Sequence, residues 1–214
     1  MRTLVVQSFV TLDGVMQAPG GAGEDPSGGF AHEGWLVPFF DDAMGAQITE
    51  WFSGVEDFLL GRTTYEIFYA SWPKMLSDDP VSQAINHKPK YVASRTLTSL
   101  EWETAELLGD DVPGAIRALK DRDGGELQVH GSAGLIQTLL AEDLVDELRL
   151  MVVPVVLGSG KRLFADGTIP RSWRLASSTI TPRGAFLGSY ERAGEVETGY
   201  VGPDLDTRLT TPES

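Results

Sequence analysis

Residues suited to phosphate binding occur in three short segments, each at the end of an apolar, strand-like run. The segments are residues 60–66 (LGRTTYE), 91–95 (YVASR) and 129–134 (VHGSAG). The guanidinium groups of Arg62 and Arg95 match the geometry of phosphate and stay charged at any working pH. Because open α/β sheets bind ligands beyond the carboxyl ends of their strands, the segments predict one nucleotide site at a sheet edge.

The segments around Arg62 and Ser132 each join a predicted strand to a predicted helix. A helix N-terminus has unpaired backbone N–H groups and the positive end of a dipole, and both favour an anion. An ordinary capped helix with a solvated arginine, or a simple strand-to-helix turn, would show the same local patterns. Taken together, the segments favour phosphate binding by a set of polar and small residues: Gly61, Arg62, Thr63, Ser94, Arg95, Gly131, Ser132, Ala133 and Gly134.

Strands alternate with amphipathic helices through the first two thirds of the chain. Hydrophobic periodicity predicts strands at residues 2–10, 56–60, 90–93 and 126–130. It predicts helices at residues 38–53, 63–69, 80–86, 111–120 and 132–141. The glycine-rich segment 20–29 (GGAGEDPSGG) predicts a loop without regular structure.

From residue 145 onward the pattern is β-rich. Apolar residues predict a long strand across 148–156, and residues 173–181 and 185–191 predict a hairpin with its turn at 182–184. Parallel βα units with an antiparallel ending predict an α/β fold whose mixed, mostly parallel sheet is flanked by helices. We predict one domain over residues 1–202 and a mobile polar tail over 203–214.

Composition restricts the possible classes of function. The 214 residues include no cysteine, which excludes disulfides, thiolate catalysis and cysteine-based zinc sites. A formal net charge of −14 disfavours general nucleic-acid binding. The three histidines lack the spacing of a metal site. Without a charged leader or a long apolar stretch, the sequence favours a cytoplasmic protein with no membrane partner.

Five motifs carry a resemblance to a known family. They are SFVTLDGV at 8–15, GRTTYE at 61–66, ASR at 93–95, HGSAGLIQTLL at 130–140 and VDELRLMVVPVVLGSGKRLF at 145–164. In this order and spacing the chain resembles the dihydrofolate reductase-like superfamily, and most closely the C-terminal reductase domain of the bifunctional riboflavin biosynthesis deaminase-reductase and its stand-alone relatives. The resemblance implies a dihydrofolate reductase-like three-layer fold and NADPH as the cofactor.

The resemblance also implies roles for individual residues. The strand around Ser8 and Phe9 would hold the nicotinamide largely through backbone groups, and Arg62 would bind the 2′-phosphate of NADPH. In folate-reducing relatives a carboxylate on the first long helix assists protonation of the substrate, and both Asp41 and Asp42 fall near that place. Two adjacent acids suit the dipole of a helix start equally well, so the catalytic choice between them stays open.

The resulting prediction is an NADPH-dependent reductase that acts on a small pterin- or pyrimidine-like heterocycle. The named activity nearest in resemblance is the reduction of 5-amino-6-(5-phosphoribosylamino)uracil in riboflavin biosynthesis. The alternatives are a dihydrofolate reductase proper and a non-catalytic nucleotide-sensing module on the same fold. The apolar segment 149–157 resembles the dimerising surface of riboflavin-type reductases and predicts a homodimer.

Overall fold

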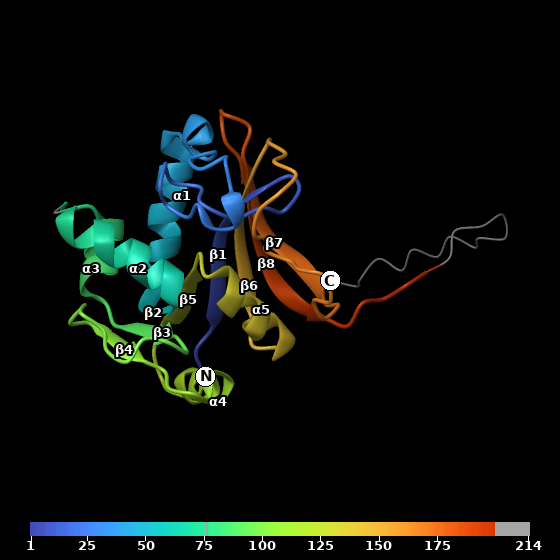
Figure 1. Cartoon of the computed structure of the whole chain (residues 1–214). Coiled ribbons are helices and arrows are strands. Elements are labelled where there is room, and N and C mark those ends of the chain that lie inside the picture. Colours follow the sequence, from blue (N-terminus) through green and yellow to red (C-terminus); the bar gives the residue numbers. More distant parts are fainter. Residues whose placement is uncertain (76, 200–214) are drawn as a thin grey trace, which may run out of the picture.

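One β-sheet organises the molecule, for which the computed structural model describes residues 1–75 and 77–199 (Figure 1). Within these residues the sheet has eight strands in the order β4-β3-β2-β5-β1-β6-β8-β7. The strands are β1 (Leu4–Thr11), β2 (Val55–Gly61), β3 (Lys90–Ala93), β4 (Ala105–Leu107), β5 (Glu126–His130), β6 (Glu147–Val153), β7 (Ser172–Ile180) and β8 (Phe186–Gly194).

Six neighbouring strands of the sheet, β4, β3, β2, β5, β1 and β6, are parallel to one another. β8 runs antiparallel to both of its neighbours, β6 and β7. The carboxyl ends of the parallel strands therefore meet at one edge of the sheet. The predicted hairpin is confirmed: Thr181 and Ala185 close it through a hydrogen bond between their backbones, and Gly184 provides the positive φ that the turn requires. The predicted mixed α/β sheet is also confirmed.

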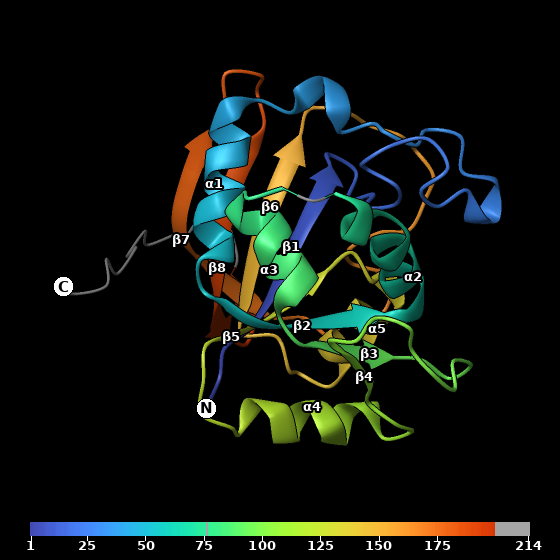
Figure 2. The same ribbon diagram turned by 90° about the vertical axis from the view of Figure 1, so that its left-hand side faces the viewer.

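Helices cover both faces of the sheet and complete a three-layer fold. On one face lie α1 (Asp42–Phe52), α2 (Arg62–Ser71) and α3 (Pro80–His87), which Figure 2 shows in front of the strands. On the other lie α4 (Val112–Lys120) and α5 (Ala133–Ala141). Short 3₁₀ turns occur at Ser27–Gly29, Val37–Phe39 and Trp72–Lys74.

Two apolar layers hold the helices to the sheet. On the side of α1, Phe58 and Leu60 of β2 pack in one cluster with Met44 and Ile48. On the opposite side, Leu4 and Val6 pack with Ile136 and Leu139 of α5. Each fully buried apolar side chain contributes about 1.5–3 kcal/mol. Strands buried on both faces read as continuous apolar runs, which is why these strands were recognisable in the sequence.

The first long helix is shorter than predicted. The sequence predicts a helix over residues 38–53, but α1 begins at Asp42 because the Asp41 carboxylate caps it by accepting a hydrogen bond from Met44 N. Pro38 instead belongs to the 3₁₀ turn Val37–Phe39, and Phe40 is extended. The loop predicted at 20–29 contains one further short turn, Ser27–Gly29, and the sequence analysis missed the three-residue strand β4.

The strand β6 lies in the interior of the sheet. It pairs with β1 on one side and with β8 on the other, so the apolar segment 149–157 is not the free edge that the predicted dimer surface requires. The exposed edge on this side is β7, which pairs only with β8 among the described strands. The tail predicted at 203–214 and the domain boundary at 202 lie outside the described residues. In the described part of the chain, no helix combines the length and apolar content needed to cross a membrane.

Candidate functional site

A cavity of about 640 Å³ opens at the carboxyl ends of β1, β2, β3 and β5. Its position matches the edge at which parallel α/β sheets bind their ligands. All the predicted cofactor-binding residues line it, although they come from four separate parts of the chain: Ser8, Phe9, Gly61, Arg62, Thr63, Ser94, Arg95, Gly131, Ser132, Ala133 and Gly134. Their roles in binding stay predictions.

The order of the strands arranges this chemistry along the cavity. Arg95 follows β3 and Arg62 follows β2, so the two guanidinium groups belong to neighbouring strands at one end. The turn at Gly131 follows β5, which lies between β2 and β1. Phe9 and Met151 mark the other end, because β1 and β6 pair there in register. The cavity thus passes from a cationic end, across a helix N-terminus, to a more apolar end.

Helix capping separates the helices of the site from the others. Asp41, Asp79 and Asp111 cap α1, α3 and α4 by accepting hydrogen bonds from backbone N–H groups of the first turn. The helices α2 and α5 have no side-chain cap, and the residues of both first turns line the cavity. Their N–H groups are therefore available to a bound anion, which the two dipoles would stabilise further.

The turn into α5 depends on close packing against α2. Gly131 has a φ of 52°, and a Cβ at this position would lie 2.9 Å from Oγ1 of Thr64. Thr64 Oγ1 in turn accepts a hydrogen bond from Ser132 N at 2.8 Å. Thr64 lies inside the GRTTYE motif but was not among the predicted site residues. Its role in the structure is to join the two helix N-termini.

Ser132 uses its hydroxyl within the fold. The Oγ atom donates to the His130 carbonyl at 2.8 Å and accepts from Gly61 N at 2.9 Å. Ser132 itself adopts a left-handed conformation, with φ 59° and ψ 42°, which is uncommon for a residue other than glycine. Its hydroxyl proton is engaged with His130, so its contribution at the cavity is the geometry of the turn.

The opposite end of the cavity contains an unpaired amide. Gln7 is 3 % exposed, its Oε1 is buried without a hydrogen-bond partner, and no hydrogen bond joins its Nε2 to another described residue. Leaving a buried polar group unpaired costs about 1–3 kcal/mol. Gln7 lines the cavity, and sequence reasoning passed over it because a lone glutamine in an apolar strand has no distinctive pattern.

Four further polar residues line the cavity that were not predicted as site residues, three from the loop after β1 and one from the segment after β6. Lys161 Nζ lies 2.6 Å from Asp25 Oδ2, and Lys161 N donates to Gln17 Oε1 at 3.0 Å. Glu24 also lines the cavity, and burial raises the pKa of its carboxyl. These residues come from a glycine-rich loop and a distant turn, so only the tertiary structure brings them together.

The two aspartates predicted as catalytic candidates lie elsewhere. Neither Asp41 nor Asp42 lines the cavity. The Asp41 carboxylate caps α1 and also accepts a hydrogen bond from Arg183 N at 3.1 Å, and the N–H of Met44 is the main cause that lowers its pKa. Asp42 occupies the first turn of the same helix, where its charge suits the dipole. The helix-start alternative therefore accounts for both residues.

Asp13 stabilises the exit of β1. Its carboxylate accepts hydrogen bonds from Thr11 Oγ1 at 2.6 Å, Gly158 N at 2.8 Å and Leu157 N at 3.2 Å. The bond from Thr11 is the main cause that lowers the pKa of Asp13, to about 2. A carboxylate so firmly ionised is no proton donor near neutral pH, so Asp13 acts as a residue that stabilises the turn after β1.

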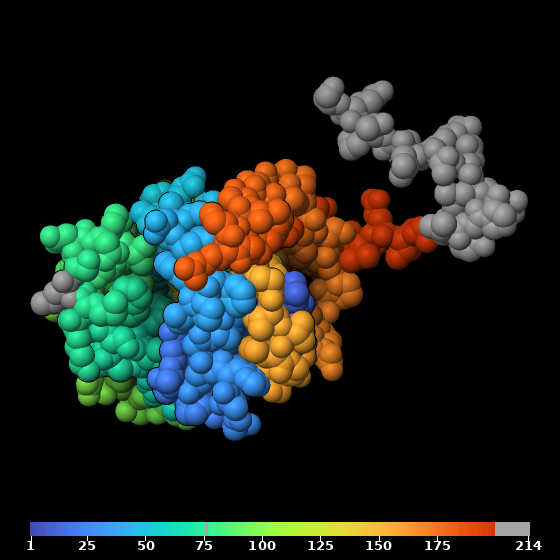
Figure 3. Space-filling model, turned by 90° about the horizontal axis from the view of Figure 1, so that it is seen from above, coloured from blue at the N-terminus to red at the C-terminus, as the bar shows by residue number. Residues whose placement is uncertain are grey.

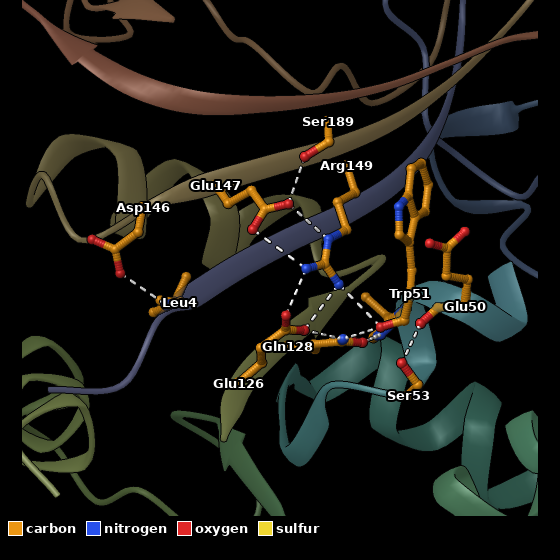
Figure 4. Close-up of polar contacts among 11 residues, drawn as sticks. Leu4, Glu50, Trp51, Ser53, Glu126, Gln128, Asp146, Glu147, Arg149 and Ser189 are labelled. Carbon is orange, nitrogen blue, oxygen red and sulfur yellow. Dashed lines mark hydrogen bonds and ion pairs between the residues drawn. The ribbon is translucent and has the colours of Figure 1, made fainter. Parts of the chain in front are cut away.

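A buried charged network lies on the α1 face of the sheet (Figure 4). Arg149 forms ion pairs with Glu126 at 2.6 Å and Glu147 at 2.8 Å, and its Nη1 donates to the Trp51 carbonyl. Gln128 donates its amide to the same carbonyl and to Glu126. The network thus joins β5 and β6 to the end of α1.

The network also determines the state of His130 at the cavity. Because the Gln128 amide nitrogen is engaged, its Oε1 faces His130 Nε2 at 3.0 Å, and that nitrogen must carry the hydrogen. Burial, together with the positive charge of Arg149, lowers the pKa of His130 to about 3. The imidazole is therefore neutral at physiological pH, and it packs between Phe52 and Phe58 as a structural residue.

These features define a class of protein: a dihydrofolate reductase-like fold with a cavity at the carboxyl edge of its sheet, lined by two arginines and two helix N-termini. Solved structures share the fold. A Shewanella sp. PV-4 protein assigned to riboflavin biosynthesis superposes with a TM-score of 0.64 at 21% identity, covering 89% of this chain and 99% of its own. Dihydrofolate reductase of Enterococcus faecalis, complexed with NADP(H), superposes with a TM-score of 0.56 at 12% identity over 89% and 96% of the two chains.

Sequence comparison identifies the family. The model of the RibD C-terminal domain family matches residues 2–187, so this chain belongs to that family. The family is one of reductases. Uncharacterized protein YyaP of Bacillus subtilis (strain 168) is 31% identical over 170 residues, which are 77% of this chain and 81% of YyaP. The resemblance inferred from the five sequence motifs is confirmed.

Proposed function

We propose that the protein is an NADPH-dependent reductase that transfers hydride to a pterin- or pyrimidine-like heterocycle. One observation carries the proposal: two uncapped helix N-termini and two arginines open into one cavity at the carboxyl edge of the sheet. No carboxylate of the described residues forms an ion pair with Arg95, and Arg62 has only a 3.4 Å contact with Glu66. Both guanidinium groups are thus free for phosphates.

The residues of the cavity fit NADPH along its length. Arg62, supported by Arg95, would hold the 2′-phosphate, and the N–H groups at the start of α5 would hold the pyrophosphate. Gly134 suits this place because the space that a side chain would occupy there is open to 4 Å. At the other end, Ser8 and Phe9 would bound the nicotinamide, and the unpaired amide of Gln7 would satisfy a carboxamide or lactam group.

The cofactor, when bound, supplies the hydride, so the protein has to align two rings and exclude water. Phe9 and Met151 provide apolar surface at the end where the rings would meet. The absence of Asp41 and Asp42 from the cavity favours the riboflavin-type reductase over a dihydrofolate reductase proper, for which a carboxylate on this helix was expected.

Titration of the protein into NADPH, followed by cofactor fluorescence, tests the binding step. We expect saturation at micromolar protein without added metal. A panel of pterins and pyrimidines, including 5-amino-6-(5-phosphoribosylamino)uracil, then tests turnover through NADPH oxidation. No saturable binding up to millimolar protein would refute the proposal, and tight binding without any turnover would favour the nucleotide-sensing alternative.

The composition and the exposed sheet edge also bear on the oligomeric state and the partners of the protein. We propose a cytoplasmic homodimer with a small-molecule substrate and no nucleic-acid partner. The formal charge of −14 supports the last point. The exposed strand β7 supports the dimer, because an unpaired edge favours pairing with a second chain.

A further inference from the structure

Glu24 brings a carboxyl group into the cavity from the glycine-rich loop. Its Oε2 accepts hydrogen bonds from Gly20 N at 2.5 Å and Gly21 N at 3.2 Å, so the side chain is held against its own loop. It is partly buried and lines the cavity. The orientation of this carboxyl is therefore fixed before any ligand binds.

The loop follows β1, the strand whose Ser8 and Phe9 are proposed to bound the nicotinamide. Met16 N donates to the Lys161 carbonyl, and Leu163 N donates to the carbonyl of Gly14. Figure 3 shows the same arrangement, with the blue N-terminal loop packed beside the yellow-orange segment that follows β6. The residue after Glu24, Asp25, pairs with Lys161 of that segment, so Glu24 lies on the side of the cavity formed by the loop after β1 and the segment after β6.

The charged groups around Glu24 leave it without a cation. Lys161, the cation of this loop cluster, pairs with Asp25, and no described lysine or arginine forms an ion pair with Glu24. Burial raises the pKa of Glu24, and the negative charges of Asp25 and Glu33 act in the same direction, against the hydrogen bonds from Gly20 and Gly21. Glu24 therefore retains a proton to higher pH than an exposed glutamate does.

No other carboxyl of the described residues both lies in this part of the cavity and has a raised pKa. Although burial opposes it, hydrogen bonds from Lys161 and Ser27 lower the pKa of Asp25 overall, so this residue stays ionised. Asp110 lines the cavity but precedes α4, on the side of the arginines. Asp41 and Asp42 lie outside the cavity. Glu24 is the one cavity carboxyl of the described residues that combines partial burial, a place in the loop after β1 and the lack of a cation.

Resting on the proposed reductase function, we propose that Glu24 is the catalytic acid of the reaction. Reduction of a C=O or C=N bond by NADPH adds a hydride to carbon and one proton to the heteroatom. The hydride comes from the cofactor, which becomes NADP⁺. The proton passes from the Glu24 carboxyl to the oxygen or nitrogen as the π bond opens, leaving the Glu24 carboxylate, which is reprotonated from solvent after product release.

Carboxyl NMR with ¹³C-labelled glutamate tests the placement without a substrate. The Glu24 resonance is identified by its absence in Glu24→Gln. We expect a raised titration midpoint in the free protein, and a lower one in the NADP⁺ complex than in the NADPH complex, because only the oxidised ring carries a positive charge. Equal midpoints in the two complexes would overturn the proposal.

Kinetics with 5-amino-6-(5-phosphoribosylamino)uracil as the probe test the chemistry. In Glu24→Gln we expect kcat to fall about hundredfold, as for loss of a general acid, with an unchanged Kd for NADPH. Glu33→Gln is the matched control: Glu33 also accepts two backbone hydrogen bonds in this loop, from Gly23 and Asp25, but does not line the cavity. Because the charge of Glu33 contributes only part of the raised pKa of Glu24, we expect a much smaller loss of kcat in Glu33→Gln than in Glu24→Gln.

The possible outcomes separate the two proposals. Near-normal turnover by Glu24→Gln, or equal losses in Glu24→Gln and Glu33→Gln, would refute the role of Glu24 and leave the reductase function standing. If the wild type does not reduce this probe, the difference between the NADP⁺ and NADPH midpoints decides the proposal. If the wild type binds neither nucleotide, the proposed function itself fails, and the role of Glu24 fails with it.

Discussion

At the scale of single residues, the fold makes little use of the two arginine side chains of the cavity. The Arg62–Glu66 pair is half-exposed and 3.4 Å long, so it contributes less than about 1 kcal/mol to stability. Lys90 shows the contrast: it is buried, donates to Lys88 O and Thr104 Oγ1, and lies over the Trp102 ring. An arginine that the fold does not need is a residue whose removal should affect binding alone.

We therefore predict that Arg62→Ala discriminates between the two nicotinamide cofactors. A charge-assisted hydrogen bond to the 2′-phosphate is worth about 1.5–3 kcal/mol, so the Kd for NADPH should rise about ten- to a hundredfold. The Kd for NADH should hardly change, because NADH lacks this phosphate. Fluorescence titrations measure both constants, and circular dichroism checks the fold. Equal weakening of both cofactors would place Arg62 at the pyrophosphate instead.

His130 should make stability depend on pH below neutrality. Its pKa is lowered to about 3 in the folded protein, from about 6.5 in the unfolded chain, so the unfolded state binds more protons between these values. The stabilisation is complete above pH 6.5 and is lost as the pH falls through this range. Urea unfolding at several pH values should show a steeper decline for the wild type than for His130→Gln, by at most about 1.4 kcal/mol per pH unit. Parallel profiles would contradict the lowered pKa.

At the scale of elements, the chain uses two kinds of helix start. The helices α1, α3 and α4 begin with an aspartate that satisfies the first N–H groups, which typically stabilises a helix by about 1 kcal/mol. The helices α2 and α5 forgo this contribution, and their stability depends on packing against the sheet and on the Thr64–Ser132 hydrogen bond. Uncapped starts at a cavity are typical of anion sites.

Filling the open space at the start of α5 should separate cofactor binding from stability. In Gly134→Leu a side chain enters space that is open to 4 Å, so no clash with the fold is expected, and leucine favours a helix more than glycine. The melting temperature should stay the same or rise. NADPH and NADH should both bind about tenfold more weakly or worse, because the pyrophosphate is common to the two. Unchanged binding of both would contradict the placement of the pyrophosphate.

At the scale of the whole molecule, the sheet ends in an unprotected edge. β7 pairs with β8 alone among the described strands, and most of its residues are exposed on the surface, including Leu175 at 46 % and Ile180 at 73 %. In Figure 1 the β7–β8 hairpin lies at the right of the sheet, on the side opposite to α2 and α3. Long exposed edges with apolar side chains favour association with another chain.

We predict a homodimer that buries this β7 surface. Light scattering at micromolar protein should give about twice the chain mass of 23.2 kDa. The double substitution Leu175→Arg and Ile180→Lys should return the mass to that of one chain by placing like charges opposite each other at the interface. A wild-type mass near 23.2 kDa would refute the dimer. A dimer insensitive to the double substitution would place the interface elsewhere.

The local pattern of residues was enough to identify most of the elements and the family. Continuous apolar runs identified the strands because a parallel sheet buries both of its faces. The GRTTYE and HGSAG motifs identified the strand-to-helix turns because such turns depend on neighbouring residues. The position of Arg62 and Arg95 at the ends of separate strands followed from the same reasoning, and the structure brings both to one cavity.

Only the tertiary contacts determined which residues far apart in the sequence lie together, and therefore which roles they have. Whether the segment 149–157 lies at an edge or in the interior depends on pairing with β1 and β8, which no local pattern contains. From the sequence, Asp41 could be an active-site acid or a helix cap. The structure shows it as the cap of α1, because its carboxylate accepts a hydrogen bond from Met44 N. Glu24 lies in a glycine-rich loop, where nothing in the sequence indicated a role in the site. It becomes a candidate acid only because the chain folds this loop onto the cavity and pairs Lys161 with Asp25 instead.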